Sequence, residues 1–152
     1  MKPTPKGWPR LSQALFYDDA AKAIDWLCEA FGFEVRLKVE GEGGRIEHSE
    51  LTYGGDALIM VASSGTKPNM PLYPRTAGPR SAGGVNTQSI LLFVDNPDEH
   101  CARAKAAGAV IVDEPKVHDY GGDYRADRSY GALDLEGHMW WFTERVRDQQ
   151  QS

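Results

Sequence analysis

The sequence has little cysteine, no long apolar run and no basic cluster. Its two cysteines, Cys28 and Cys101, lie inside separate predicted helices, so we expect reduced core thiols and no disulfide framework. No apolar run approaches the roughly 20 residues that a bilayer span requires. The basic N-terminal residues are followed by no apolar stretch typical of a signal peptide. We therefore expect a cytoplasmic protein with no membrane partner.

The charge balance is acidic. The 22 Asp and Glu residues exceed the 17 Lys and Arg residues, which gives a net charge of −5. Because no run of Lys and Arg is longer than two residues, nothing predicts a surface that could neutralise a phosphate backbone, and we expect no nucleic-acid partner. The acidic balance instead favours a cationic small ligand. A chain of 152 residues, 41% of them hydrophobic, suits one compact domain.

The chain contains an internal repeat. Residues 12–30 (SQALFYDDAAKAIDWLCEA) align without a gap on residues 89–107 (SILLFVDNPDEHCARAKAA). Phe16 then falls on Phe93 and Asp18 on Asp95. Each copy has a short apolar strand, a polar cap and a helix that ends near a glycine. The repeat therefore predicts two similar supersecondary units in tandem.

Both predicted helices carry start and stop signals. The apolar stripe of the first helix, at helical spacing, is formed by Ile24, Leu27, Cys28 and Phe31. Asp19 is its expected N-cap and Gly32 its C-cap. The second helix is expected to begin after Asn96, with Pro97 in its first turn, and to close at Gly108. Helices this short with one apolar face must pack on a flat surface such as a sheet.

Three strand-like runs follow each helix. They span 33–40, 45–53 and 57–63 in the first half, and 109–118, 128–135 and 138–145 in the second. The order strand, helix, strand, strand, strand (βαβββ) therefore occurs twice. We predict an α+β domain over 11–145, with module one at 11–63 and module two at 88–145. Residues 64–87, rich in Pro and Gly, are expected to form an irregular linker or flap, and 1–10 and 146–152 to be flexible ends.

Three segments resemble a known family. They are IEHSELTYGGDALIMV (46–61), NTQSILLFVDN (86–96) and DRSYGALDLEGHMWWF (127–142). They resemble the vicinal oxygen chelate superfamily of glyoxalases, bleomycin resistance proteins and dioxygenases, and within it the PhnB-like branch. The resemblance implies curled mixed sheets with helices on their convex faces, a small ligand in the concave pocket, and a homodimer. The family includes both enzymes and proteins that sequester drugs.

Strand alternation predicts which side chains line that pocket. The expected lining residues are Ser12, Phe16, Met60, Ser89, Leu91, Arg128, Tyr130 and Trp141. The indole of Trp141 would provide a stacking surface for a flat or apolar ligand. Arg128 and Tyr130, on the neighbouring strand, would add a cation and a hydroxyl to the same wall.

The resemblance also implies where a metal would bind. Metal-dependent members take His, Glu or Gln ligands from the first and fourth strands of both modules. In this sequence those positions fall on Ser12, Ser89, Trp141 and either Met60 or Ile59. None of these side chains is a suitable ligand for Zn, Ni or Fe. We therefore expect no divalent metal and no other cofactor.

Two polar groups remain as candidate sites. His48 and Glu50 are two residues apart on one strand, so they share a face and form the best polar pair in the predicted pocket. A loop cluster could hold a hard cation, although its spacing matches no calcium-binding loop; it comprises His118, Asp119, Asp123 and Asp127.

Two main functions follow from these residues. The first is a glyoxalase or bleomycin-resistance-like protein that binds or sequesters a small molecule without a metal. The alternative is a lyase, isomerase or epimerase that uses Glu50 as general base with His48 or Tyr130 as acid partner, or with an atypical metal held by His48 and Glu50. A regulatory domain that pairs with another protein is a third hypothesis.

Overall fold

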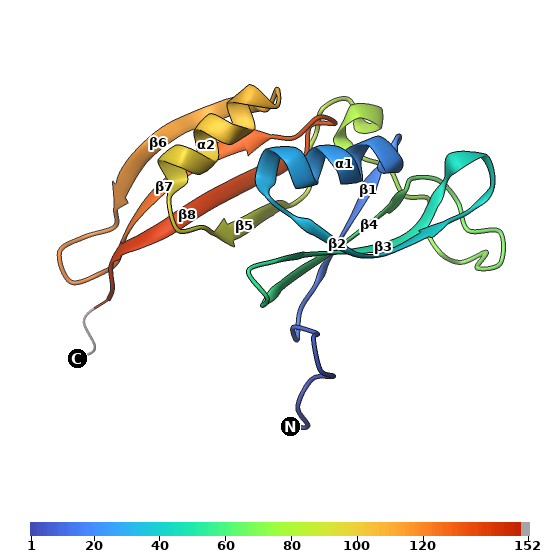
Figure 1. Cartoon of the computed structure of the whole chain (residues 1–152), viewed down its shortest axis with the longest axis horizontal. Coiled ribbons are helices and arrows are strands. Elements are labelled where there is room, and N and C mark those ends of the chain that lie inside the picture. Colours follow the sequence, from blue (N-terminus) through green and yellow to red (C-terminus); the bar gives the residue numbers. More distant parts are fainter. Residues whose placement is uncertain (150–152) are drawn as a thin grey trace. The chain divides into compact units, whose positions relative to one another are not determined.

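The computed structural model describes residues 1–149 and divides into two compact units. Each unit contains one α-helix and one four-stranded sheet (Figure 1). The first, Met1–Val85, contains β1 (Gln13–Tyr17), α1 (Ala20–Phe31), β2 (Glu34–Glu40), β3 (Ile46–Tyr53) and β4 (Ala57–Ser63), with short 3-10 helices at Glu42–Gly44 and Pro79–Ala82. The second, from Asn86 onward, contains β5 (Ser89–Phe93), α2 (Pro97–Ala106), β6 (Val110–Asp119), β7 (Ala126–Leu133) and β8 (Met139–Arg147).

The two sheets have the same topology. Their strand orders are β1-β4-β3-β2 and β5-β8-β7-β6. The outer pairs β1/β4 and β5/β8 are parallel and the remaining pairs are antiparallel, so both sheets are mixed and open. The prediction of an α+β fold with two tandem βαβββ modules is therefore confirmed.

The helices begin at the predicted caps. The side chain of Asp19 accepts a hydrogen bond from the Lys22 backbone N–H at 3.1 Å, and Asn96 accepts one from the Glu99 backbone N–H at 3.2 Å. Gly32 ends α1 with φ 83°, a left-handed conformation that glycine adopts without steric cost. These caps satisfy N–H groups that a helix terminus would otherwise leave unpaired.

Strand alternation separates a buried face from an accessible face in each sheet. Side chains on the helix-covered face are buried, among them Leu15, Tyr17, Leu51 and Val61 in the first unit and Leu92, Tyr130, Trp140 and Phe142 in the second. Each large apolar side chain removed from water contributes about 1.5–3 kcal/mol to stability. The face opposite the helix, called the concave face below, carries the side chains available to a ligand.

The segment 64–87 is more structured than its composition predicted. It contains the 3-10 helix Pro79–Ala82 and an isolated bridge between Gly65 and Thr76. The Ser81 hydroxyl donates to both carboxylate oxygens of Asp18, at 2.9 and 2.7 Å, and thereby attaches the segment to the end of β1. The segment has no α-helix or strand, and the Pro and Gly pattern gave no sign of its side-chain hydrogen bonds to Asp18.

The last strand, the two cysteines and the two helices can each be compared with the predictions from the sequence. β8 extends through Arg147, two residues beyond the predicted strand end, while residues 150–152 of the predicted flexible end lie outside the described part of the chain. Both cysteines are free thiols, and burial raises the pKa of the Cys101 thiol. Within residues 1–149 neither α-helix has the length and apolar character needed to cross a membrane.

Candidate ligand-binding site

The polar pair predicted on β3 is part of a three-residue cluster. His48 Nε2 lies 3.1 Å from Glu50 Oε2, and Arg36 Nε donates to Glu50 Oε1 at 2.9 Å. Arg36 occupies a β-bulge, since the pairing of β2 with β3 shifts register between Val35 and Leu37. The bulge turns Arg36 toward the face that carries His48 and Glu50. Sequence analysis missed Arg36 because simple alternation does not anticipate a bulge.

Both oxygens of Glu50 are therefore engaged. The hydrogen bond with His48, followed by the hydrogen bond and charge of Arg36, holds the pKa of Glu50 below its ordinary value of 4.5. Arg36 in turn donates to the Gly7 carbonyl at 2.5 Å and lies 4.9 Å from the ring centre of Trp8. The N-terminal segment therefore packs on the cation that holds Glu50. A carboxylate whose ionised form is stabilised in this way is a weak general base.

The remaining predicted residues of the first unit do not form one pocket. Ala14 pairs with Met60, so Met60 shares the concave face with Phe16, whereas Ile59 is buried and pairs with Leu51. An open cavity of about 640 Å³ lies at the end of this face, and residues of the 65–76 segment form part of its lining. Phe16 lines the cavity, with Ile46, Ala62, Arg45 and Lys67 among its other residues. Neither Met60 nor Ser12 is among the residues that line it.

The second unit has a smaller pocket on its concave face. Its volume is about 240 Å³, and its lining residues are Leu91, His118, Tyr120, Arg125, Asp127, Ser129, Trp141 and Thr143. Leu91 and Trp141, both predicted as pocket residues, are directly paired across β5 and β8. Ser89 lies two residues before Leu91 on the same face and is exposed, outside this lining. We call this cavity the Trp141 pocket.

Trp141 lies directly over a glycine of the neighbouring strand. The register pairs Gly131 with Trp141. A Cβ atom added to Gly131 would lie 3.0 and 3.2 Å from ring carbons of Trp141 and 2.8 Å from Met139 Cε. The missing side chain therefore leaves the space that the indole fills. Glycine inside a strand indicates such a close approach, so Gly131 was the signal in the sequence that could have placed Trp141.

Arg128 and Tyr130 do not line the Trp141 pocket, contrary to the prediction. Arg128 donates two hydrogen bonds to the Asp98 carboxylate in the first turn of α2, at 2.6 and 2.7 Å. The Tyr130 hydroxyl lies 2.5 Å from His100 Nδ1, also on α2, and the side chain is fully buried. Because Gly131 is the residue paired with Trp141, the even-numbered residues of β7 point to the helix side. An error of one residue in the expected register moved both side chains to the wrong face.

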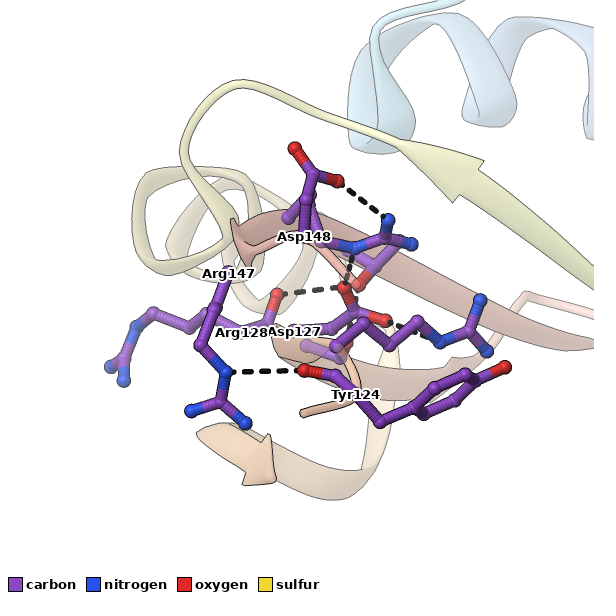
Figure 2. Close-up of polar contacts among 9 residues, drawn as sticks. Tyr124, Asp127, Arg128, Arg147 and Asp148 are labelled. Atoms are coloured by element: carbon purple, nitrogen blue, oxygen red, sulfur yellow. Dashed lines mark hydrogen bonds and ion pairs between the residues drawn. The ribbon is translucent and has the colours of Figure 1, made fainter. Parts of the chain in front are cut away.

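Asp127 and Ser129 are the β7 residues that face the Trp141 pocket. The buried Asp127 carboxylate accepts a hydrogen bond from Arg145 Nε, and Arg145 also donates to Asp148 at 3.1 Å (Figure 2). The Ser129 and Thr143 hydroxyls lie 2.5 Å apart and are buried. The hydrogen-bond acceptors at this end of the pocket are therefore already in use.

The loop between β6 and β7 forms one wall of the same pocket. Arg147 donates to the Tyr124 carbonyl at 3.1 Å, as Figure 2 shows, and to both oxygens of Asp119 at 2.6 and 3.1 Å. These hydrogen bonds lower the pKa of Asp119 to about 2. The Arg125 guanidinium lies 5.4 and 5.7 Å from the rings of Tyr120 and Tyr124, within the range of cation–π attraction. Asp119 and Asp127, predicted as possible cation ligands, are instead paired with Arg147 and Arg145.

The residues at the predicted metal positions do not fit a metal. Ser12 Oγ is buried without a hydrogen-bond partner in the described chain, Ser89 is exposed, and Met60 and Trp141 offer a thioether and an indole. None of the four positions carries an imidazole or a carboxylate that could act as a metal ligand. In residues 1–149, moreover, no three His, Cys, Asp or Glu side chains gather where they could hold a metal ion.

Relatives and solved structures resemble the chain over most of its length. Uncharacterized proteins of Mycobacterium bovis and Mycobacterium tuberculosis are 31% identical to it over 140 residues, which is 92% of this chain and 86% or 76% of theirs. The crystal structure of TioX from Micromonospora sp. ML1 has 32% identity and a TM-score of 0.67 and covers 90% of this chain and 98% of that one.

A more distant structural neighbour has the same fold. TnmS3, an antibiotic binding protein from Streptomyces sp. CB03234, is 22% identical with a TM-score of 0.59, over 89% of this chain and 93% of its own. The family model of the glyoxalase/bleomycin resistance protein/dioxygenase superfamily matches residues 11–142, nearly the whole βαβββ pair. This chain therefore belongs to the glyoxalase/bleomycin resistance protein/dioxygenase superfamily.

Proposed function

We propose that this protein binds a flat aromatic small molecule in the Trp141 pocket and sequesters it without a metal or other cofactor. The observation that carries the proposal is the indole of Trp141, which lies over Gly131 on the wall of a pocket of about 240 Å³. Leu91 adds an apolar surface beside the indole. Aromatic surfaces with a few polar groups are typical of sites for small organic ligands.

Two further observations support binding over catalysis. The predicted metal positions carry Ser12, Met60, Ser89 and Trp141, which do not suit the Lewis-acid chemistry of metal-dependent superfamily members. One structural neighbour, TnmS3, is described as an antibiotic binding protein. An aromatic natural product of the antibiotic type is therefore the first ligand class to test.

Replacement of Trp141 by alanine tests the proposal. The ligand would lose its stacking surface, so we expect its affinity to fall by about tenfold or more. The measurement is isothermal titration calorimetry with aromatic hits from a thermal-shift screen of antibiotics and metabolites. The matched control is Trp26→Ala, because Trp26 lies on α1 of the first unit. Equal affinity of Trp141→Ala and wild type would place the ligand elsewhere and refute the proposed site.

The alternative function, a lyase, isomerase or epimerase with Glu50 as base, has one favourable observation. The structure brings His48 and Glu50 within 3.1 Å of each other, as the sequence predicted. The lowered pKa of Glu50 and its hydrogen bond from Arg36 argue against strong basicity near neutral pH. We therefore propose that the cluster of Arg36, His48 and Glu50 stabilises the first unit and does not abstract a proton.

The Glu50 cluster predicts a pH dependence of stability. Because the folded-state pKa of Glu50 is lowered from 4.5, its stabilising contribution is complete above that pH and is lost as the pH falls through the folded-state pKa. We expect Glu50→Gln to be less stable than wild type near neutral pH, and the difference to shrink below about pH 4. Urea unfolding at several pH values measures it, with Glu34→Gln on exposed β2 as control. A stability difference between Glu50→Gln and wild type that stays constant over all pH values would contradict the stabilising role of the ionised Glu50 carboxylate.

The finer assignments are also proposals. We propose that the protein is a homodimer of the PhnB-like branch, as the resemblance of its three segments implies, and that it is cytoplasmic, as expected where no signal-peptide pattern is found. Sedimentation velocity at micromolar concentration tests the dimer, and a monomer would contradict it. Elemental analysis of untagged protein tests the proposed absence of a metal, and a content near one equivalent would overturn it.

A further inference from the structure

We infer that the Trp141 pocket selects aromatic ligands that carry an anionic or strongly hydrogen-bond-accepting oxygen, such as an aromatic carboxylate. The inference rests on the proposed function and names the ligand class for that site. Its basis is the set of polar groups that the pocket leaves without partners. In the described chain these groups are ring and guanidinium nitrogens of His118 and Arg125, whereas the Asp127 carboxylate and the Ser129 and Thr143 hydroxyls already have partners.

The acceptors of the pocket are engaged. Asp127 is 5% exposed and accepts from Arg145. The buried hydroxyls of Ser129 and Thr143 lie 2.5 Å from each other, and the Thr143 hydroxyl also lies 3.5 Å from the Arg128 carbonyl. A ligand that needed an acceptor here would have to break one of these contacts. A cationic ligand would in addition meet the guanidinium of Arg125 on the same wall.

Two donors in the pocket have no hydrogen-bond partner. Within residues 1–149, buried side-chain nitrogen or oxygen atoms without a partner occur at only three positions, and two of them, His118 Nε2 and Arg125 Nε, belong to residues that line this pocket. Arg125 Nε lies 3.7 Å from Asp127 Oδ2 and His118 Nε2 lies 3.4 Å from Asp113 Oδ2, so each nitrogen lies near a carboxylate oxygen without a hydrogen bond to it. A buried polar group without a partner costs free energy, so an oxygen that accepts from such a group is favoured.

The donors are held in place by their neighbours. The rings of Tyr120 and Tyr124 flank the Arg125 guanidinium, and the His118 ring lies edge-on to Trp141, with centroids 6.4 Å apart at 90°. His118 donates from Nε2 in one neutral tautomer and from both ring nitrogens when protonated. A ring stacked on Trp141 would therefore place an attached carboxylate among fixed donors, an arrangement that favours binding because little mobility is lost.

The pocket size sets the size of the aromatic group. A cavity of about 150 Å³ holds one benzene ring, so a pocket of about 240 Å³ accommodates two fused rings. Naphthalene carrying different substituents is accordingly a suitable probe. The net charge of −5 favours a cationic ligand at long range, so the local donors and the overall charge predict opposite preferences.

The experiment compares probes that differ only in their polar group: 2-naphthoate, 2-naphthalenemethanol and 2-naphthylmethylammonium. Titration calorimetry at low salt gives their affinities for the full chain. We expect 2-naphthoate to bind at least about tenfold more tightly than the ammonium probe, as charge-assisted hydrogen bonds imply. In Arg125→Gln that preference should fall to less than about threefold. The matched control is Arg103→Gln, which removes the same charge from an exposed position on α2.

The outcomes separate this inference from the proposed function. Equal binding of the three probes, or a preference for the ammonium, would overturn the inference and leave the aromatic site intact, provided that Trp141→Ala still lowers the affinity by about tenfold or more. If Arg125→Gln keeps the same preference for 2-naphthoate, Arg125 is not the group that recognises the carboxylate. The comparison of the three probes on the wild-type protein does not depend on whether this variant folds. If no aromatic compound binds, the proposed function and this inference both fail.

Discussion

Phe142→Ala is expected to lower the free energy of unfolding by about 3–5 kcal/mol, the range for removing a buried aromatic ring. The Phe142 ring is fully buried between β8 and α2. It lies 4.4 Å from the His100 ring, 5.0 Å from Tyr130 and 5.9 Å from Trp140, measured between centroids. Alanine would leave a cavity where these three rings meet. Urea denaturation followed by circular dichroism measures the loss.

The neighbouring residue provides the control. Trp141 precedes Phe142 in sequence but points to the opposite face of β8, where its indole lines an open pocket. We expect Trp141→Ala to cost less than about 1.5 kcal/mol because a partly exposed side chain that lines an open pocket leaves little buried cavity. Equal destabilisation by the two variants would mean that the alternation along β8 differs from the structure.

The fold was predictable because its signals are local and occur twice. The aligned segments at 12–30 and 89–107, the caps Asp19 and Asn96, and the glycine that ends α1 each act within a few residues. Such signals can be recognised without knowledge of tertiary contacts. The repeat then supplied the tandem arrangement, which no single element could have indicated.

The site was less predictable because it depends on register between strands. A shift of one residue between β7 and β8 decides whether Tyr130 or Gly131 lies beside Trp141. Alternation placed Trp141 and Leu91 on the concave face, where they line the cavity, but placed Arg128 and Tyr130 on the wrong face. Arg36 was missed for a related reason, since a bulge in β2 changes the direction of its side chain.

The loop wall of the Trp141 pocket shows a second reason why the site could not be predicted from the sequence. The sequence predicted a loop cluster of His118, Asp119, Asp123 and Asp127 that could hold a hard cation. In the structure, Arg147 from β8 binds Asp119, and Arg145 binds Asp127. These arginines are 28 and 18 residues away in sequence, so no local pattern indicates the pairs. A polar pocket built from such distant pairs becomes visible only when the strands are placed side by side.

A buried carboxylate organises the turn that positions Trp141. Asp134 follows β7 and accepts three hydrogen bonds: from the backbone N–H of Glu136, from the backbone N–H of His138, and from the indole N–H of Trp140, each at 3.0 Å. The first two hold the turn between β7 and β8. The third joins that turn to the core on the α2 side. The predicted strands 128–135 and 138–145 left this turn between them, but nothing in the sequence pattern identified Asp134 as the residue that holds it.

Asp134→Ala is expected to destabilise the protein by about 3–4 kcal/mol, because three donors lose their acceptor and each unsatisfied buried donor costs about 1–3 kcal/mol. Asp134→Asn retains one acceptor oxygen and should lose about half as much. Asp148→Ala, at an aspartate whose side chain is 84% exposed, controls for the charge. Urea unfolding provides the stabilities, and ligand titration shows whether Trp141 is displaced. If Asp134→Ala loses less than about 1 kcal/mol, water has replaced the carboxylate and Asp134 does not organise the turn.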